Sequence, residues 1–482
     1  MNNQVNHVGN AFSELMKIRA GKPISADELN IIKGTPLFKT PFLVNETVTD
    51  VLAARAIAAN DLWELRTGHR QKISIDQEVA AATCLGGTDA TLKKNADGTY
   101  EPITTTPEFS KMVSITQPWE TADHRYFLPH FNLPNLEKRV LNVLNCEATP
   151  NSVAKAVHSW NATDLDRAIA DAHACGGIAF TKEEWLHHPQ GQYLNSRPVV
   201  EITKIADAKP RSFSKVNESS SPLASIKVLD LTRILAGPTA SLSLAEHGAD
   251  VLMVTSPNLP QVPAFVRDTS HGKRSVFLDY TNRTQTQTLK RLAGDADIFV
   301  EGYRPGAMSR HGFSPSSLAK IHPGIIYVSV NCFGTGGPYA SRAGWDQVAQ
   351  AVTGMCSTQG SLTGAEHPVL APVFMCDFLT GYLAAFGAMI ALQRQISEGG
   401  SYHVAVSLCQ SAMLLQREGI TKAFETATGR LTPDKFEQYA VCDNDTIYGD
   451  LKSLGPAIKM SETPLTWKNS TPALGSAQAV WL

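Results

Sequence analysis

The sequence has almost no excess of charge of either sign. Its 482 residues include 43 lysines and arginines and 45 aspartates and glutamates, a net charge of -2. A balanced charge gives no general reason to expect nucleic acid or an anionic membrane as a partner. We therefore predict no nucleic-acid partner and no membrane partner, and any anion site must come from a local cluster of basic residues.

Disulfide and zinc frameworks are also missing. The eight cysteines are scattered and form no C-x-x-C pair, which favours free thiols in a reducing compartment. His124, His130 and His187-His188 have no acid or cysteine at ligand spacing, so we predict no metal. Because the first residues, MNNQVNHVGN, lack a secretory pattern and the last four, AVWL, are no peroxisomal signal, we expect a cytoplasmic protein, with peroxisome and mitochondrion left open.

The longest apolar run, Phe378 to Leu392, is short for a membrane span and rich in small residues, so we predict a buried core helix. It follows Asp377, the only charge between Glu366 and Arg394. A lone carboxylate that enters an apolar helix has two interpretations. One is a helix N-cap, and the other is a nucleophile or base that the helix end keeps ionised.

A polar, serine-containing stretch at 207–222 predicts a linker between residues 1–206 and 223–482. After it, strand patterns alternate with helix patterns. The fold class predicted for 223–482 is therefore α/β, with an open parallel sheet. The strands are expected at 224–232, 248–255, 296–300 and 324–330, with helices at 239–247, 284–293 and 315–321.

The α/β half lacks the fingerprints of dinucleotide binding. The first turn contains Leu-Ala-Gly237-Pro238, not G-x-G-x-x-G, and no Walker lysine is present. Two basic loops remain, Lys273-Arg274 and Arg304. Ligands of open α/β sheets bind where strands end in loops, so these residues are candidates for holding phosphates. The alternative is a solvated basic face.

The region around Asp377 has a weak copy near the start of the chain. At one constant offset, Pro372 corresponds to Pro41, Thr380 to Thr49, and 383–385 to 52–54, both reading Leu-Ala-Ala. A second echo relates 197–202 to 455–460. We interpret this as a degenerate internal duplication, with Glu46 at the position of Asp377.

Five blocks of the second half, in this order and spacing, resemble the family III CoA-transferases, the CaiB/BaiF family. The resemblance covers roughly 222–410, and residues 1–206 resemble the part of the family that follows the catalytic residue, in weakened form. The blocks are LDLTRILAGPTASLSLAEHGADVLMV, HGKRSVFLDY, DADIFVEGYRPGAMSRHGF, IIYVSVNCFGTGGPYASRAGWDQVAQAVTG and PVFMCDFLTGYLAAFGAMIALQRQ.

The resemblance implies a Rossmann-like domain that binds coenzyme A, with Asp377 as the catalytic nucleophile. It implies transfer of CoA from an acyl-CoA to a carboxylic acid through an aspartyl-CoA thioester, and a homodimer. The CoA-binding residues it implies are Lys273, Arg274, Arg304, Gly237 and Pro238. It also suggests that residues 1–206 supply, in the same chain, what normally follows the catalytic half.

Two other functions stay open. Racemases of the same superfamily use a histidine in a Gly-His-Asp triplet, where this sequence has Gly344-Trp345-Asp346. Because an indole N–H cannot shuttle a proton at neutral pH, this difference favours a transferase over an epimerase. The third alternative is a CoA-binding protein without catalytic activity. The sequence does not identify the two acids.

Overall fold

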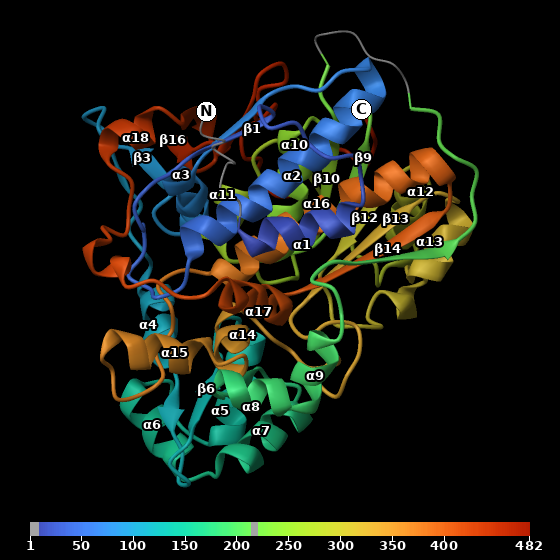
Figure 1. Cartoon of the computed structure of the whole chain (residues 1–482). Helices are drawn as coiled ribbons and strands as arrows, with labels where there is room; N and C mark the ends of the chain where they lie inside the picture. Colours follow the sequence, from blue (N-terminus) through green and yellow to red (C-terminus); the bar gives the residue numbers. More distant parts are fainter. Residues whose placement is uncertain (1–8, 214–219) are drawn as a thin grey trace.

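The computed structural model describes residues 9–213 and 220–482. Helix α16 (Met375–Glu398) runs through the centre of the molecule (Figure 1). Among the described residues it is the one helix long and apolar enough to cross a membrane, and its apolar window is wholly buried in the protein. The predicted buried core helix is confirmed. It is longer than the sequence pattern indicated, because it continues to Gly399, whose positive φ ends it.

The main sheet has seven strands and the order β11-β10-β9-β12-β13-β14-β8. Six strands are parallel and β8 is antiparallel to β14. The six parallel strands follow the order 3-2-1-4-5-6 of doubly wound folds, which confirms the predicted α/β sheet. The strands are β8 (Glu201–Ala206), β9 (Lys227–Leu231), β10 (Asp250–Thr255), β11 (Lys273–Phe277), β12 (Ile298–Glu301), β13 (Ile326–Asn331) and β14 (Ser401–Ser407).

Helices cover both faces of this sheet. On one face, α10 (Ala236–Glu246) packs against α16 within the larger apolar core. A separate core holds α12 (Arg283–Gly294) and α13 (Pro315–Ile321) against the other face. Helix α10 begins earlier than the predicted start at Thr239. Pro238 fits inside the first turn, where no N–H is needed.

The internal duplication is visible in the element boundaries. Helix α2 (Val44–Thr67) and α16 have 24 residues each, and their ends match when Pro41 is aligned with Pro372. The same alignment places the start of α3 (Gln77–Ala82) at the start of α17 (Leu408–Glu418). The N-cap residues Leu43 and Phe374 even share a backbone conformation, with φ, ψ of -76, 62 and -81, 54. Helices α2 and α16 pack against each other at the centre of the molecule (Figure 1).

The two halves of the sequence exchange strands. Strand β8 of the first half joins the main sheet beside β14, with Ile202 opposite Val404. Strand β17 (Ile458–Met460) of the second half joins β1 (Leu29–Ile32) and β2 (Ile73–Asp76), with Met460 opposite Ile73. Residues 1–206 and 223–482 are therefore interlocked in space. Part of the predicted linker, 214–219, lies outside the described residues.

A smaller unit from the first half lies at the bottom of Figure 1. It packs against α14 (Asp346–Val352) and α15 (Met355–Thr363) of the second half. Its sheet is β5 (Trp119–Glu120), β6 (Tyr126–Pro129) and β7 (Gly176–Ile178), and its helices are α4 (Pro107–Ile115), α5 (Pro134–Leu144), α6 (Pro150–His158), α7 (Ala162–Asp171), α8 (Lys182–His187) and α9 (Pro189–Asn195). We call residues 107–195 the small domain.

Both halves of the sequence also contribute strands to one more sheet, and the C-terminal end of the chain lies along an edge of the main sheet. This additional sheet is β15 (Ala440–Thr446), β16 (Gly449–Leu454), β3 (Thr91–Lys94) and β4 (Tyr100–Pro102). At the C-terminus, Ala477 donates its N–H to Ser275 O of the edge strand β11. The tail thereby covers one free edge of the main sheet.

Candidate active site

A pocket of about 290 Å³ opens at the carboxyl ends of β9 and β12. The chain continues from β9 toward one side of the sheet and from β12 toward the other side. The crevice between these two neighbouring strands is therefore the topological switch point, where ligands of doubly wound folds bind. The loops 233–237 and 302–305 form two walls, and the small domain forms a third with Leu133, Asn135 and Leu136. The pocket is therefore built by both halves of the sequence.

Asp377 lies in this pocket at the start of α16, with 7% of its surface exposed. It is not a helix N-cap, which was one of the two interpretations left open by the sequence, since the N-cap position belongs to Phe374. The backbone N–H of Ala236, the first residue of α10, lies close enough to the carboxylate to lower its pKa. The N-terminus of a neighbouring helix thus points at the carboxylate.

A glycine makes this approach possible. A Cβ atom on Gly381 would lie 2.6 Å from the carbonyl oxygen of Ala236 and 2.6 Å from Cβ of Thr239. Both distances are too short for any side chain. Gly381 therefore lets α10 and α16 touch, and that contact brings the Ala236 N–H to Asp377.

A second acid fixes the backbone at Asp377. Asp346, the first residue of α14, is fully buried and accepts the backbone N–H of Asp377 on Oδ2 at 3.0 Å. Its Oδ1 accepts from the side chain of Gln350. Burial raises the pKa of Asp346 to about 6, against the hydrogen bonds that lower it. In the sequence, Asp346 was noted only as the last residue of the Gly344-Trp345-Asp346 triplet.

Burial decides the charge state of Asp377. The apolar surroundings raise its pKa well above the usual value, and the nearby charge of Asp346 raises it further. The Ala236 N–H lowers the pKa of Asp377, but the two opposing effects are larger. The helix end therefore acts in the direction that favours ionisation of this carboxylate, as the sequence led us to expect, but burial and Asp346 act against it more strongly. When it is ionised, the carboxylate is a basic and poorly solvated nucleophile.

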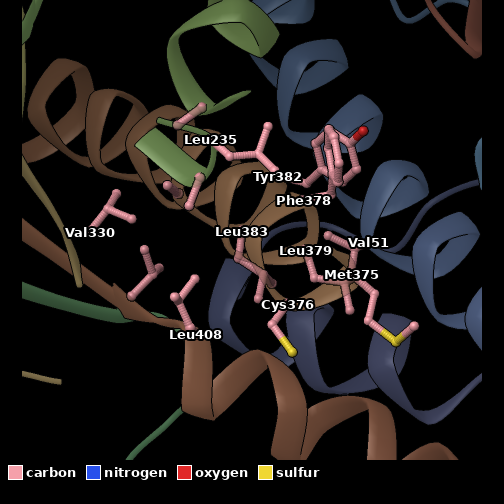
Figure 2. Packing of buried hydrophobic residues seen from close by; sticks show 14 of the residues in the cluster. Val51, Leu235, Val330, Met375, Cys376, Phe378, Leu379, Tyr382, Leu383 and Leu408 are labelled. Atoms are coloured by element: carbon pink, nitrogen blue, oxygen red, sulfur yellow. The ribbon is translucent and has the colours of Figure 1, made fainter. Parts of the chain in front are cut away.

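Apolar side chains surround the acid. Leu235, Val330 and Leu408 line the pocket from three different elements, as Figure 2 shows around the start of α16. Trp345 forms part of the wall and stacks on His130, with ring centroids 4.9 Å apart. Burial lowers the pKa of His130 to about 4, so this histidine is neutral at pH 7. Such walls limit the access of water to Asp377.

Three arginines line the pocket, and two keep their charge without an acidic partner. Arg342 forms a bidentate ion pair with Asp166. Arg304 donates only to the carbonyl of His173 and Arg233 to that of Pro260. Within 9–213 and 220–482, neither Arg304 nor Arg233 has a carboxylate within 4.0 Å. Their positive charge is available to an anion.

Lys273 is not at this site, and its predicted contact with phosphate is wrong for this structure. It begins β11, at the amino ends of the parallel strands, opposite the edge where Arg304 follows β12. Its side chain is fully buried and pairs with Asp230 at 3.2 Å. It also donates to the carbonyl of Pro238 at 2.8 Å. Lys273 thereby ties α10 to the sheet.

Arg274 lies at the same remote edge. Its guanidinium pairs with Asp250 at 2.9 Å and donates to the carbonyl of Val480. It therefore anchors the C-terminal tail. The two basic loops do not meet, because a residue that begins a parallel strand and a residue that follows one lie at opposite edges.

The remaining predicted residues divide between pocket and packing. Gly237 lines the pocket, whereas Pro238 lies behind it, beside Lys273. A Cβ atom on Gly237 would meet Thr232 at 2.4 Å, so the turn after β9 needs a glycine there. No group of three or more His, Cys, Asp or Glu side chains in the part of the chain that the structure describes is placed to hold a metal ion.

Fold and site define an α/β protein with a buried carboxylate at the ligand crevice of a doubly wound sheet. Residues 223–442 match the family model of CoA-transferase family III. The second half of the chain therefore belongs to CoA-transferase family III.

Curated relatives agree with this assignment. An acyl-CoA transferase of Gibberella moniliformis is 29% identical over 96% of this chain and 90% of its own length. The acetyl-coenzyme A transferase nodX of Hypoxylon pulicicidum is 32% identical over 61% of this chain and 53% of its own length. The succinyl-CoA:glutarate CoA-transferase of Mus musculus is 34% identical over 45% and 54%. The chain thus spans about half the length of most of these relatives.

Solved structures show a partial overlap. A CAIB/BAIF family protein from Brucella suis is 31% identical, with 41% of this chain and 56% of that chain covered and a TM-score of 0.36. A hypothetical protein from Mycobacterium tuberculosis gives a TM-score of 0.38, with 41% and 58% covered.

Proposed function

We propose that the protein transfers coenzyme A from an acyl-CoA donor to a carboxylic acid acceptor, with Asp377 as the covalent nucleophile. The observation that carries this proposal is the position of the Asp377 carboxylate. It is buried at the crevice of the sheet, lies beside the backbone N–H of Ala236 at the start of α10, and is fixed through its backbone by Asp346. A carboxylate so placed can attack a thioester while the apolar walls exclude water.

The first half of the reaction moves CoA onto the protein. An oxygen of Asp377 attacks the thioester carbonyl, the C–S bond breaks, and CoA leaves as the thiolate, which gives a mixed anhydride. The thiolate then attacks the carboxyl carbon of Asp377 and the donor acid leaves as a carboxylate. The product is an aspartyl-CoA thioester, and the Ala236 N–H can stabilise the negative oxygen that forms on Asp377 when the thiolate attacks its carboxyl carbon.

The second half reverses these steps with the acceptor. The acceptor carboxylate attacks the aspartyl thioester and displaces the thiolate, which then attacks the acyl carbon of the acceptor. The new acyl-CoA leaves and the Asp377 carboxylate is regenerated. No water enters the balance, so the free energy of the thioester is kept. The apolar side chains beside Asp377 serve this requirement, because they limit the access of water to the intermediates.

Arg304 and Arg233 are the residues we assign to the phosphates of CoA. Both line the pocket at the carboxyl ends of the strands and both lack an acidic partner in the described structure. Guanidinium groups bind phosphate through charge-assisted hydrogen bonds. The acyl group of the donor then lies against the wall of Leu235, Val330 and Leu408.

The test is covalent trapping. The protein is incubated with acetyl-, succinyl- and longer acyl-CoA donors, the classes that the relatives' names mention. Hydroxylamine or borohydride is added, and the modified residue is mapped by mass spectrometry. We expect modification at Asp377, none in Asp377→Ala, and full modification in Glu46→Gln, the matched change in the other copy. No modification with any donor, together with exchange of the acyl α-proton in D₂O, would overturn the transferase in favour of an epimerase.

A further inference from the structure

The two copies of the internal repeat have lost opposite parts of one common unit. The first copy, α2-β2-α3, keeps the small domain, but the described chain before it holds only α1 (Asn10–Arg19) and β1. The second copy, α16-β14-α17, keeps the parallel sheet before it. In the described residues it is followed by a short 3-10 helix (Ala423–Thr426), α18 (Pro433–Glu437) and β15, with no small domain. Neither copy alone contains all the walls of the pocket.

The two losses are complementary at the pocket. The sheet of the second copy supplies Asp377 and the loops after β9 and β12, and the small domain of the first copy supplies Leu133, Asn135 and Leu136. The strand exchange holds these parts together, because β8 follows the small domain directly and pairs with β14 beside α16. One complete site results.

The corresponding place in the first copy is closed. Helix α1 packs on α2 as α10 packs on α16. Asp50 lies at the position of Gly381, and its carboxylate accepts the backbone N–H groups of Gly9 at 3.1 Å and Phe12 at 3.2 Å. Glu418 accepts that of Asn10 at 3.2 Å. The helix N-terminus that faces a free carboxylate in the second copy is therefore capped by the protein's own acids in the first.

We infer that each chain forms one complete site in cis, from both copies of its own repeat, and that the site needs no second chain. What the site does rests on the proposed function, but where it is assembled does not. The competing arrangement is a homodimer in which the segment 207–222 passes each first half to the partner's second half. That dimer would contain the same local contacts, but each contact between a first half and a second half would join two different chains.

A disulfide across β8 and β14 distinguishes the two arrangements without any need for activity. Thr203 and His403 are direct partners on these antiparallel strands, at a spacing that a disulfide can bridge. The test variant is Thr203→Cys with His403→Cys in a Cys442→Ser background, since Cys442 is the one exposed native cysteine in the described structure. Mild oxidation is followed by non-reducing electrophoresis and peptide mapping.

We expect a 203–403 disulfide within one chain and no band of twice the 52.1 kDa chain mass. A disulfide between two chains would overturn the inference, and so would the absence of any 203–403 disulfide. The matched control is Lys452→Cys, which pairs with the native Cys442 on the neighbouring strands β15 and β16 of one hairpin. This control shows that the oxidation closes a cross-strand pair in this protein.

The number of sites gives an independent readout. Native mass spectrometry with acyl-CoA is expected to show at most one covalent adduct per chain, lost in Asp377→Ala and retained in Glu46→Gln. Two adducts per chain would contradict the closed first copy. If no adduct forms but the 203–403 disulfide lies within one chain, the proposed function fails and the assembly in cis stands.

Discussion

The backbone N–H of Asp377 donates to Oδ2 of Asp346 at 3.0 Å, so one buried acid holds the other in place. Asp346 has no exposed surface and Asp377 only 7%. The two carboxylates are close enough that the charge of Asp346 opposes ionisation of Asp377. Asp346 is thus a positioning residue that also tunes the acidity of the nucleophile.

This pair predicts a shift in the pH profile. The nucleophile must be deprotonated, and burial together with Asp346 raises its pKa, so kcat/KM should still increase with pH above the range in which an ordinary aspartate titrates. In Asp346→Asn one negative charge is lost, the pKa of Asp377 falls, and the rising limb should move to lower pH. Asparagine keeps an oxygen for the Asp377 N–H, which preserves the geometry.

The measurement is kcat/KM between about pH 5 and pH 9 for both proteins, since this ratio reports the free enzyme. If the rising limb of the pH profile stays at the same pH in Asp346→Asn, the charge of Asp346 does not act on Asp377. A loss of activity at every pH, without a shift, would assign Asp346 to positioning alone.

The opposite locations of Arg304 and Arg274 give a matched pair of substitutions. Arg304→Ala removes a charge from the pocket and should raise KM for acyl-CoA about 10- to 100-fold, the effect of one or two charge-assisted hydrogen bonds. Arg274→Ala removes the same charge from the remote edge, where it holds Asp250 and the tail. Steady-state kinetics should show KM unchanged in Arg274→Ala. An equal rise in both would refute a phosphate site at Arg304.

Much of the fold was predictable because periodicity and order along the chain report local structure. The alternating strands and helices after 223 gave the parallel sheet, and the correspondence between 41–54 and 372–385 matched the boundaries of α2 and α16. The strand exchange was not predictable. The one related sequence signal was the similarity between 197–202 and 455–460. A strand that pairs with a distant part of the chain leaves no periodic pattern that identifies its partner.

Site residues were predictable where the local sequence is unusual. They were not predictable where long-range packing brings them to the pocket. Asp377 stood out as a lone acid before an apolar run. Lys273 was misassigned, because a basic residue beside a strand has the same sequence signal at either edge of the sheet. Arg233 and the small-domain residue Leu133 were missed, since nothing local marks a residue that becomes a wall by long-range packing. The cytoplasmic location stays a prediction of the sequence.

The buried pair of Lys273 and Asp230 predicts a large loss of stability when one partner is removed. Both side chains have no exposed surface, and Lys273→Met leaves the Asp230 carboxylate buried without its cation. Such a change costs about 3–5 kcal/mol. The midpoint of urea unfolding should fall clearly in Lys273→Met and recover in part when Asp230→Asn is added. A midpoint that does not move would mean that the pair is not buried as described.

Substitutions at two glycines of α16 can distinguish the effect of core packing from the effect of the contact between α10 and Asp377. A Cβ atom on Gly381 would lie 2.6 Å from Ala236 O, and one on Gly387 would lie 2.6 Å from Val404 Cγ1. Both alanine substitutions overpack the core, which costs about 1–3 kcal/mol each. Only Gly381→Ala pushes α10 away from Asp377.

We therefore expect similar decreases in the urea midpoint for Gly381→Ala and Gly387→Ala but a difference in turnover. Loss of one backbone donor at the reacting group corresponds to a fall in kcat of about 10²-fold, as at other oxyanion sites, and it should appear in Gly381→Ala alone. Gly387→Ala should keep kcat near that of the parent, because the side chain it adds meets Val404 and Val200, which do not line the pocket. Equal falls in kcat would show that general loosening of α16, not the Ala236 N–H, limits the reaction.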